Sequence, residues 1–181
     1  MRVLILTGSP HSQGTTALLA DEFSMGAKSA GHDVIRIDTA KLQIHPCRGC
    51  SYCRKTGGIC VFNDGMTHIY PELLWADAVV LVTPLYYFGM TAQLKNTLDR
   101  FFAVNSELRN GNKQFLLISA CHDKESWAME ALVLHFRTVA RYLNWQDKGM
   151  VLAQGADSRK DLEGTEYPRL ARELGESLGA R

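Results

Sequence analysis

The first sixteen residues constrain the fold of this chain more than any other segment. An apolar stretch from Val3 to Leu6 runs directly into the loop TGSPHSQGTT (7–16), and a helical pattern follows. A buried strand that ends in a small, hydroxyl-rich, glycine-containing loop before a helix gathers backbone N–H groups, hydroxyls and a helix N-terminus around one point. The segment therefore predicts a phosphate-binding loop.

The residues of this loop argue against the two commonest phosphate-binding motifs. The GxxxxGK[ST] motif of nucleoside triphosphate sites requires a lysine after its second glycine, but Thr15 follows Gly14 here. The GxGxxG motif of dinucleotide sites requires three spaced glycines, and the loop has only Gly8 and Gly14. The phosphate of a mononucleotide is the better match.

Length, charge and cysteine content limit the class of protein. At 181 residues, the chain is expected to be a single domain, 1–181. With 20 Lys and Arg against 19 Asp and Glu, no basic face for nucleic acid is expected. The apolar runs are far shorter than the ~20 residues of a membrane span, and Arg2 leads directly into the first strand, so neither a membrane anchor nor a signal peptide is expected. We expect a cytoplasmic protein, whose five cysteines are metal-binding, catalytic or free rather than disulfide-bonded.

Strand-like and helix-like patterns alternate along the chain. Each strand-like run is apolar on consecutive residues, as expected when helices cover both faces of a parallel sheet. The pattern predicts an α/β fold with a five-stranded parallel sheet of order 2-1-3-4-5. The runs lie at 3–7, 33–37, 78–83, 114–120 and 149–153, with a closing helix at 166–178 and one long cysteine-bearing insertion loop at 39–64.

The predicted sheet order brings three loops to one cavity at the carboxyl edge. They are the phosphate loop, the aromatic loop TPLYYFGM (83–90) and the loop 120–123. Tyr86, Tyr87 and Phe88 suit stacking against a flat ring, although adjacent aromatics after a strand also serve as core packing. A phosphate site at one end of a cavity and aromatic residues at the other describe flavin mononucleotide (FMN).

The chain resembles the flavodoxin-like NAD(P)H-dependent FMN reductases, including their iron–sulfur flavoprotein branch. The resemblance is carried by TGSPHSQGTT, the cysteine run, DGMTHIYPELLWADAVVLVTPLYYFGMTAQLKNTLDR and the C-terminal LGESL, and it covers most of the chain. It implies a three-layer flavodoxin-like fold and a homodimer. It further implies that the FMN phosphate is held by Ser9, His11, Gly14, Thr15 and Thr16, and the ring by Pro84, Leu85, Tyr86, Tyr87, Phe88, Gly89, Cys121 and His122.

The sequence departs from this family at two positions. His11 stands where relatives usually carry a basic residue, often arginine, which weakens charge pairing to the phosphate. Asp64 and Gly65 stand where relatives commonly show two acidic residues, and we interpret Asp64 as the cap of the following helix.

The cysteine run follows the pattern C-x2-C-x2-C-x6-C. Its members Cys47, Cys50, Cys53 and Cys60 can converge in a tight turn and hold a [4Fe-4S] cluster or a zinc ion. The resemblance favours the cluster; free or disulfide-forming thiols in an apolar interface loop are the other interpretation. The fifth cysteine, Cys121, is expected to shape the flavin pocket rather than to act as a nucleophile.

The function expected from these observations is that of an FMN-dependent NAD(P)H oxidoreductase. The nicotinamide passes hydride to FMN, and a quinone, flavin or nitroaromatic acceptor then takes the electrons from the same open face. No catalytic side chain is expected, because the cofactor carries the chemistry. One alternative is an iron–sulfur flavoprotein that relays electrons between FMN, a [4Fe-4S] cluster and a protein partner. A second is a non-enzymatic thiol redox or metal sensor.

Overall fold

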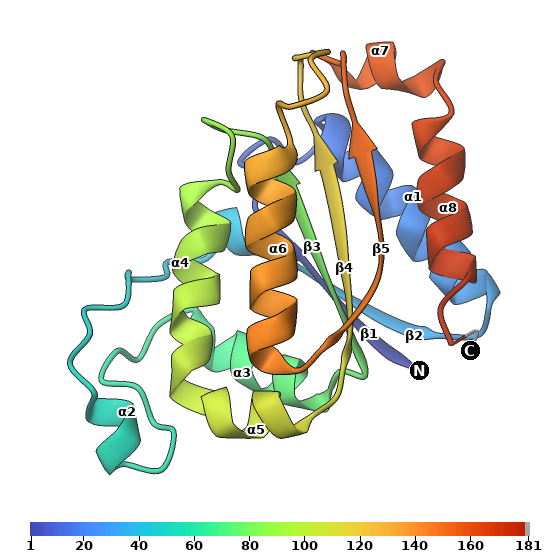
Figure 1. Cartoon of the computed structure of the whole chain (residues 1–181). Helices are drawn as coiled ribbons and strands as arrows, with labels where there is room; N and C mark the ends of the chain where they lie inside the picture. The colour runs from blue at the N-terminus through green and yellow to red at the C-terminus, as the bar shows by residue number, and fades with distance from the viewer. Residues whose placement is uncertain (180–181) are drawn as a thin grey trace.

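The computed structural model describes residues 1–179, and its centre is a five-stranded parallel sheet (Figure 1). The strand order β2-β1-β3-β4-β5 confirms the predicted order. The apolar runs form these strands because consecutive buried residues need cover on both faces of the sheet. The strands are β1 (Arg2–Thr7), β2 (Asp33–Asp38), β3 (Ala78–Pro84), β4 (Gln114–Ala120) and β5 (Gln146–Ala153).

Helices cover both faces of the sheet, and each face has its own apolar core (Figure 1). One core packs alternate residues of β1, β3 and β4 against α3 (Met66–Trp75), α4 (Ala92–Arg100) and α6 (Glu130–Leu143). The other core packs the intervening residues against α1 (Thr15–Ser29), α7 (Arg159–Glu163) and α8 (Tyr167–Glu176). The result is the three-layer arrangement that the sequence predicted.

Two glycines allow α1 and α8 to cross with their backbones in contact. A Cβ atom added to Gly26 would collide with the carbonyl oxygen of Arg172, and one added to Gly175 would collide with that of Phe23. Glycine permits this approach because it has no side chain to separate the helices. The close crossing fixes the C-terminal helix against the helix that begins at the phosphate loop.

The fifth strand begins three residues earlier than the sequence predicted. Gln146 and Asp147 are exposed and polar, so the apolar pattern that marks the other strands is missing there. The pairing with β4 shifts register between Phe115 and Leu117. Gly149 lies in this irregularity with a φ of +118°, a backbone conformation typical of a glycine-containing bulge.

The insertion at 39–64 is largely irregular, as predicted. It contains the 3-10 turn η1 (Thr39–Lys41) and the four-residue helix α2 (Tyr52–Lys55). Two further short elements that the sequence did not predict, η2 (Phe101–Val104) and α5 (Asn105–Asn110), follow α4. Across residues 1–179, the helices are all too short or too polar to serve as a membrane span.

Candidate functional site

A cavity of about 410 Å³ opens at the carboxyl edge of the sheet. The three loops that the sequence assigned to this edge do meet there, and a fourth loop, which follows β5, joins them. The cavity is lined by Ser9, His11, Gly14, Thr15, Pro84, Leu85, Tyr86, Ala120, Cys121, His122, Ala156, Asp157, Ser158 and Arg159.

The phosphate loop is fixed at its start by the neighbouring strand and by α4. The Gly8 backbone donates to the carbonyl of Val82 at 2.8 Å, and the Thr91 hydroxyl donates to the carbonyl of Gly8 at 2.8 Å. A Cβ atom added to Gly8 would collide with the Thr91 hydroxyl and would lie 2.6 Å from Cβ of Leu94. Gly8 therefore lets the loop pack directly against the N-terminus of α4.

Helix α1 begins at this loop with an open N-terminus. Gly14 occupies the N-cap position in an extended conformation and provides no side-chain cap, and the first turn contains no acidic residue. The first N–H groups of a helix have no partner within the helix, so those of Thr15 and Thr16 are suited to an anion. Thr15 lines the cavity, whereas Thr16 is buried and does not.

The aromatic loop makes a tight, strained turn beside the cavity. Tyr86 and Gly89 exchange two backbone hydrogen bonds of 3.0 and 3.1 Å, with Tyr87 and Phe88 between them at φ of +46° and +61°. These values correspond to a type I′ turn, which glycine and asparagine normally occupy. Bulky residues in this conformation carry strain, and such strain is concentrated at functional sites.

Only part of the predicted ring-binding set lines the cavity. Pro84, Leu85 and Tyr86 do so, together with Cys121 and His122 from the neighbouring loop. Tyr87 is fully exposed, and Phe88 packs against Trp127 with ring centroids 5.2 Å apart. Phe88 thus links the aromatic loop to the loop after β4. The roles of all these residues in binding FMN stay predictions.

The fourth loop, residues 154–158, was not included in the predicted site. Its backbone continues the pairing of the two last strands, since Ala156 donates to the carbonyl of Cys121 at 3.0 Å. Its carboxylate Asp157 pairs with Nδ1 of His122 at 2.8 Å. The loop directly follows a parallel strand, so the strand order alone, extended to β5, would have placed it at this edge.

Cys121 forms part of the cavity wall. Burial raises the pKa of its thiol, and the nearby carboxylate of Asp123 acts in the same direction. The thiol donates to the carbonyl of Asp123 at 3.2 Å. A buried thiol with a raised pKa is a poor nucleophile, because the thiolate is the reactive form. The structure thus favours the predicted pocket-shaping role over nucleophilic catalysis.

The four cysteines of the insertion do not converge in the structure. Cys47 and Cys50 are exposed and precede α2, while Cys53 within α2 and Cys60 after it are half-buried. Within residues 1–179, no three His, Cys, Asp or Glu side chains are grouped so that they could hold a metal ion. Ser51 and Gly49 adopt left-handed conformations that turn the chain between the first thiols. This arrangement does not fit a four-thiolate cluster or zinc site.

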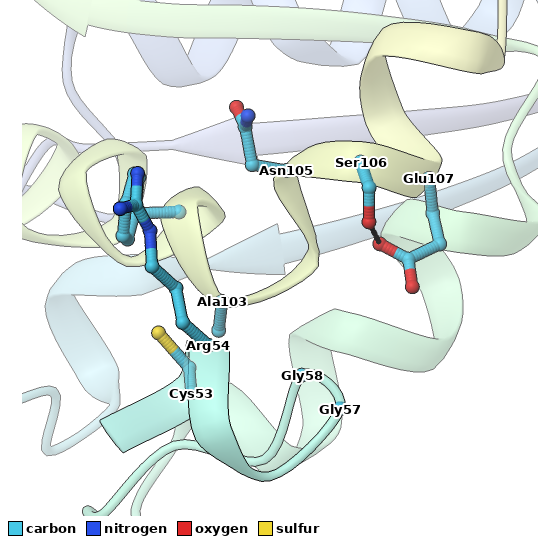
Figure 2. Close-up of a pocket in the computed structure, with 9 residues that line it drawn as sticks. Cys53, Arg54, Gly57, Gly58, Ala103, Asn105, Ser106 and Glu107 are labelled. Atoms are coloured by element: carbon cyan, nitrogen blue, oxygen red, sulfur yellow. Dashed lines mark hydrogen bonds between the residues drawn. The ribbon is translucent and has the colours of Figure 1, made fainter. Parts of the chain in front are cut away.

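Cys53 instead lines a second cavity of about 330 Å³, which lies between the α2 segment and the η2–α5 segment (Figure 2). Arg54 lies over the ring of Phe102 with its guanidinium carbon 5.1 Å from the ring centroid. On the other side, Ser106 of α5 donates to Glu107 at 2.6 Å. Figure 1 shows α2 and α5 at the end of the molecule opposite the carboxyl ends of the strands. The cysteine-bearing insertion at 39–64, called the cysteine segment below, therefore has its cysteines far from the first cavity within one chain.

Asp64 anchors the end of the cysteine segment. Its Oδ1 accepts from the backbone of Met66, the first residue of α3, at 3.1 Å, although Gly65 rather than Asp64 holds the N-cap position. Its Oδ2 also pairs with Arg100 at 2.8 Å, and both side chains are almost fully buried, with exposed fractions of 3% and 1%. Burial alone would raise the pKa of Asp64, but hydrogen bonds from Arg100 and from the His45 and Met66 backbones lower it to about 2.

The two cysteine environments lead to a prediction about thiol reactivity. The Tyr52 backbone N–H and the Arg48 guanidinium lower the pKa of the exposed Cys50 thiol, whereas burial raises that of Cys121. We expect iodoacetamide at pH 7.5 to alkylate Cys50 first and Cys121 last, as followed by peptide mass spectrometry. Unfolded protein, in which all five thiols are accessible, is the control. Equal rates at Cys50 and Cys121 in the folded protein would contradict the prediction.

Comparison with known proteins identifies the family. A family model described as NADPH-dependent FMN reductase matches residues 1–155. The chain is 35% identical over 105 residues to an iron–sulfur flavoprotein of Methanocaldococcus jannaschii, covering 58% of this chain and 52% of that protein. It is 31% identical over 135 residues to an iron–sulfur flavoprotein of Archaeoglobus fulgidus, covering 66% of each. The matches thus span between about half and two thirds of these relatives.

The fold is shared with solved structures at lower identity. An FMN-dependent NADH-azoreductase from Bacillus anthracis, solved in complex with FMN, superposes with a TM-score of 0.75 at 16% identity. The superposition covers 97% of this chain and 98% of that one, which confirms the flavodoxin-like fold. Because the family model spans 155 of 181 residues, the chain belongs to the NADPH-dependent FMN reductase family, as its motifs predicted.

Proposed function

We propose that this protein is an FMN-dependent NAD(P)H oxidoreductase. The observation that carries the proposal is the shared cavity: the open N-terminus of α1 forms one wall, and the edge of the aromatic loop at Pro84 and Tyr86 forms another. This pairing suits a ligand with a phosphate at one end and a flat ring at the other. Family membership supports the same ligand.

The residues of the cavity fit FMN in three respects. The absence of a side-chain cap at Gly14 leaves the first N–H groups of α1 open to a phosphate. The packing of Gly8 against Thr91 fixes the loop that carries Ser9. The volume of about 410 Å³ lies within the range of roughly 300–1,000 Å³ that is usual for small-molecule sites.

We assign binding and orientation to the protein. FMN, when bound, accepts hydride from the nicotinamide and passes electrons to the acceptor. Thr15 and the α1 N-terminus hold the phosphate, while Pro84, Tyr86 and Cys121 limit where the ring can lie. The His122–Asp157 pair stands at the same cavity and joins its third and fourth loops.

Nicotinamide and acceptor are proposed to use one open face in turn. The sequence contains no GxGxxG motif that would hold the dinucleotide at a separate site. A single face used alternately gives a substituted-enzyme mechanism. Initial rates measured at several NADPH and quinone concentrations should then give parallel double-reciprocal lines.

The proposal is tested by flavin binding followed by reduction. Purified protein is titrated with FMN while quenching of the flavin fluorescence is recorded, and the complex is mixed anaerobically with NADH or NADPH. We expect saturable binding, bleaching of the flavin absorbance by a reduced nicotinamide, and its return when a quinone is added. Absence of FMN binding, or binding without bleaching by either nicotinamide, would overturn the proposal.

The cysteine segment has no role in this proposed electron path. Both curated relatives described above bear the name iron–sulfur flavoprotein, which indicates an iron–sulfur cluster in those proteins. In this chain the four thiols are spread along α2 and its flanking turns and do not fit such a cluster. The proposed path therefore runs only between nicotinamide, FMN and an external acceptor.

A further inference from the structure

Arg159 lies in the flavin cavity although sequence reasoning did not point to it. It is the first residue of α7, directly after the β5 loop, and it lines the same cavity as Ser9, His11 and Thr15. Its backbone position is fixed by a capping box, in which Ser158 accepts from the Asp161 backbone and Asp161 accepts from the Ser158 backbone. The turn therefore holds the base of the arginine side chain at the cavity.

The phosphate end of this cavity has few positive charges. Among its lining residues, Arg159 is the one side chain that carries a permanent positive charge, since the other basic residues there are His11 and His122. The phosphate monoester of FMN is close to a dianion at neutral pH, as the second pKa of such a group is about 6. Arginine suits phosphate because its planar guanidinium forms paired, charge-assisted hydrogen bonds.

The present partners of Arg159 hold its side chain only weakly. Its contact with Asp21 is 4.0 Å long, and Asp21 already has Arg36 at 2.8 Å. Its other partner, Glu163, lies one helical turn away at 3.1 Å, and both side chains are well exposed. Exposed pairs of this kind contribute little, so a phosphate close to a dianion is the stronger partner for the guanidinium.

We propose that Arg159 is a phosphate-binding residue. When FMN binds, the guanidinium of Arg159 releases the carboxylates of Asp21 and Glu163 and pairs with the phosphate of FMN instead. The inference rests on the proposed function, because it assumes that FMN occupies this cavity. It adds the first residue of α7, directly after the fourth loop, to the phosphate site at the N-terminus of α1. Asp21 keeps Arg36 as its partner when Arg159 turns away.

The test compares two flavins that differ only in the phosphate. Dissociation constants for FMN and riboflavin are measured by fluorescence titration for the wild-type protein and for Arg159→Gln. Loss of a hydrogen bond to a charged group corresponds to a roughly 10- to 100-fold loss of affinity. We expect a loss of this size for FMN and none for riboflavin. Raising the salt concentration should weaken FMN binding by the wild type more than by the variant.

A matched control removes the competing partner and keeps the arginine. Glu163→Gln frees Arg159 from its exposed ion pair, so FMN binding should be as tight as in the wild type or tighter. Unchanged FMN affinity in Arg159→Gln, or equal losses for FMN and riboflavin, would overturn the phosphate role of Arg159 alone. If the wild type binds neither flavin, the proposed function and this inference both fail. Failure of the Arg159 role alone is therefore distinguishable from failure of the proposed function.

Discussion

Replacing Arg100 by methionine is expected to lower the free energy of unfolding by about 3–5 kcal/mol, because removing one partner of a buried ion pair leaves the other charge uncompensated. Arg100 pairs with Asp64 at 2.8 Å and also donates to the His45 carbonyl at 2.7 Å. Its guanidinium carbon lies 5.2 Å from the ring centroid of Phe62. These contacts join α4 to both flanks of the cysteine run, at His45 before it and at Phe62 and Asp64 after it. Urea unfolding followed by circular dichroism measures the loss.

The control for this variant lies on the same helix. Lys95 and Asp99 form an exposed pair at 2.7 Å, one turn apart on α4. Lys95→Met removes a charge of the same sign at a similar cost in helix propensity, and is expected to change the free energy by no more than about 0.5 kcal/mol. Equal losses in the two variants would show that the Arg100–Asp64 pair has no special contribution.

The pH dependence of the stability difference between the wild type and Arg100→Met provides a second check. The folded protein lowers the pKa of Asp64 from 3.8 to about 2, so the stabilisation is complete above pH 3.8 and is lost as the pH falls through 2. Protonation also removes the uncompensated charge that destabilises Arg100→Met. The gap between wild type and variant should therefore be largest at neutral pH and narrow as the pH falls and Asp64 of the variant becomes protonated. A gap that widens in acid would contradict the assignment.

Replacing Thr15 by aspartate is expected to have opposite effects on flavin binding and on stability. The new carboxylate stands at the first position of α1, where the helix has no acidic residue. It faces the phosphate as a like charge, a contact that costs several kcal/mol and corresponds to a roughly 100-fold or greater loss of FMN affinity. In the FMN-free protein, the same carboxylate interacts favourably with the helix dipole and should add about 0.3–1 kcal/mol to the free energy of unfolding.

Two measurements and two comparisons distinguish this effect from damage to the fold. FMN and riboflavin affinities are determined by fluorescence titration, and stability is determined by urea unfolding without flavin. Thr15→Ser keeps the hydroxyl and should resemble the wild type in both measurements. Riboflavin has no phosphate, so Thr15→Asp should bind it as the wild type does. Normal FMN affinity in Thr15→Asp would show that the phosphate does not lie at the N-terminus of α1.

The sequence predicted the sheet, and the loops that meet at its carboxyl edge, because both depend on local patterns. Continuous apolar runs marked four strands nearly to the residue, and the strand order then placed three loops together. The fifth strand was shortened because Gln146 and Asp147 are polar. The loop after this strand, which carries Asp157, and the following residue Arg159 were left out of the predicted site, because the crevice was drawn only from strands one, three and four.

The Asp64–Arg100 pair and the arrangement of the four cysteines depend on contacts between residues that are distant in the sequence, and the spacing of residues within a motif does not predict such contacts. Asp64 was assigned a capping role from its neighbours, and it does accept from the backbone of Met66 at the start of α3, although Gly65 holds the N-cap position. Its stronger partner, Arg100, is 36 residues away in the sequence, so no local motif identifies the pair. The spacing of the cysteines likewise permits convergence without requiring it. Left-handed turns at Gly49 and Ser51 and the anchor at Asp64 direct the chain elsewhere.

Helix α4 connects the phosphate loop to the cysteine segment. At the start of α4, the hydroxyl of Thr91 donates a hydrogen bond to the carbonyl of Gly8 in the phosphate loop. At the last residue of the helix, Arg100 forms an ion pair with Asp64. A helix of nine residues is a stiff rod of about 14 Å. The cysteine segment and the cavity at the carboxyl edge of the sheet are thus attached to opposite ends of one rigid element.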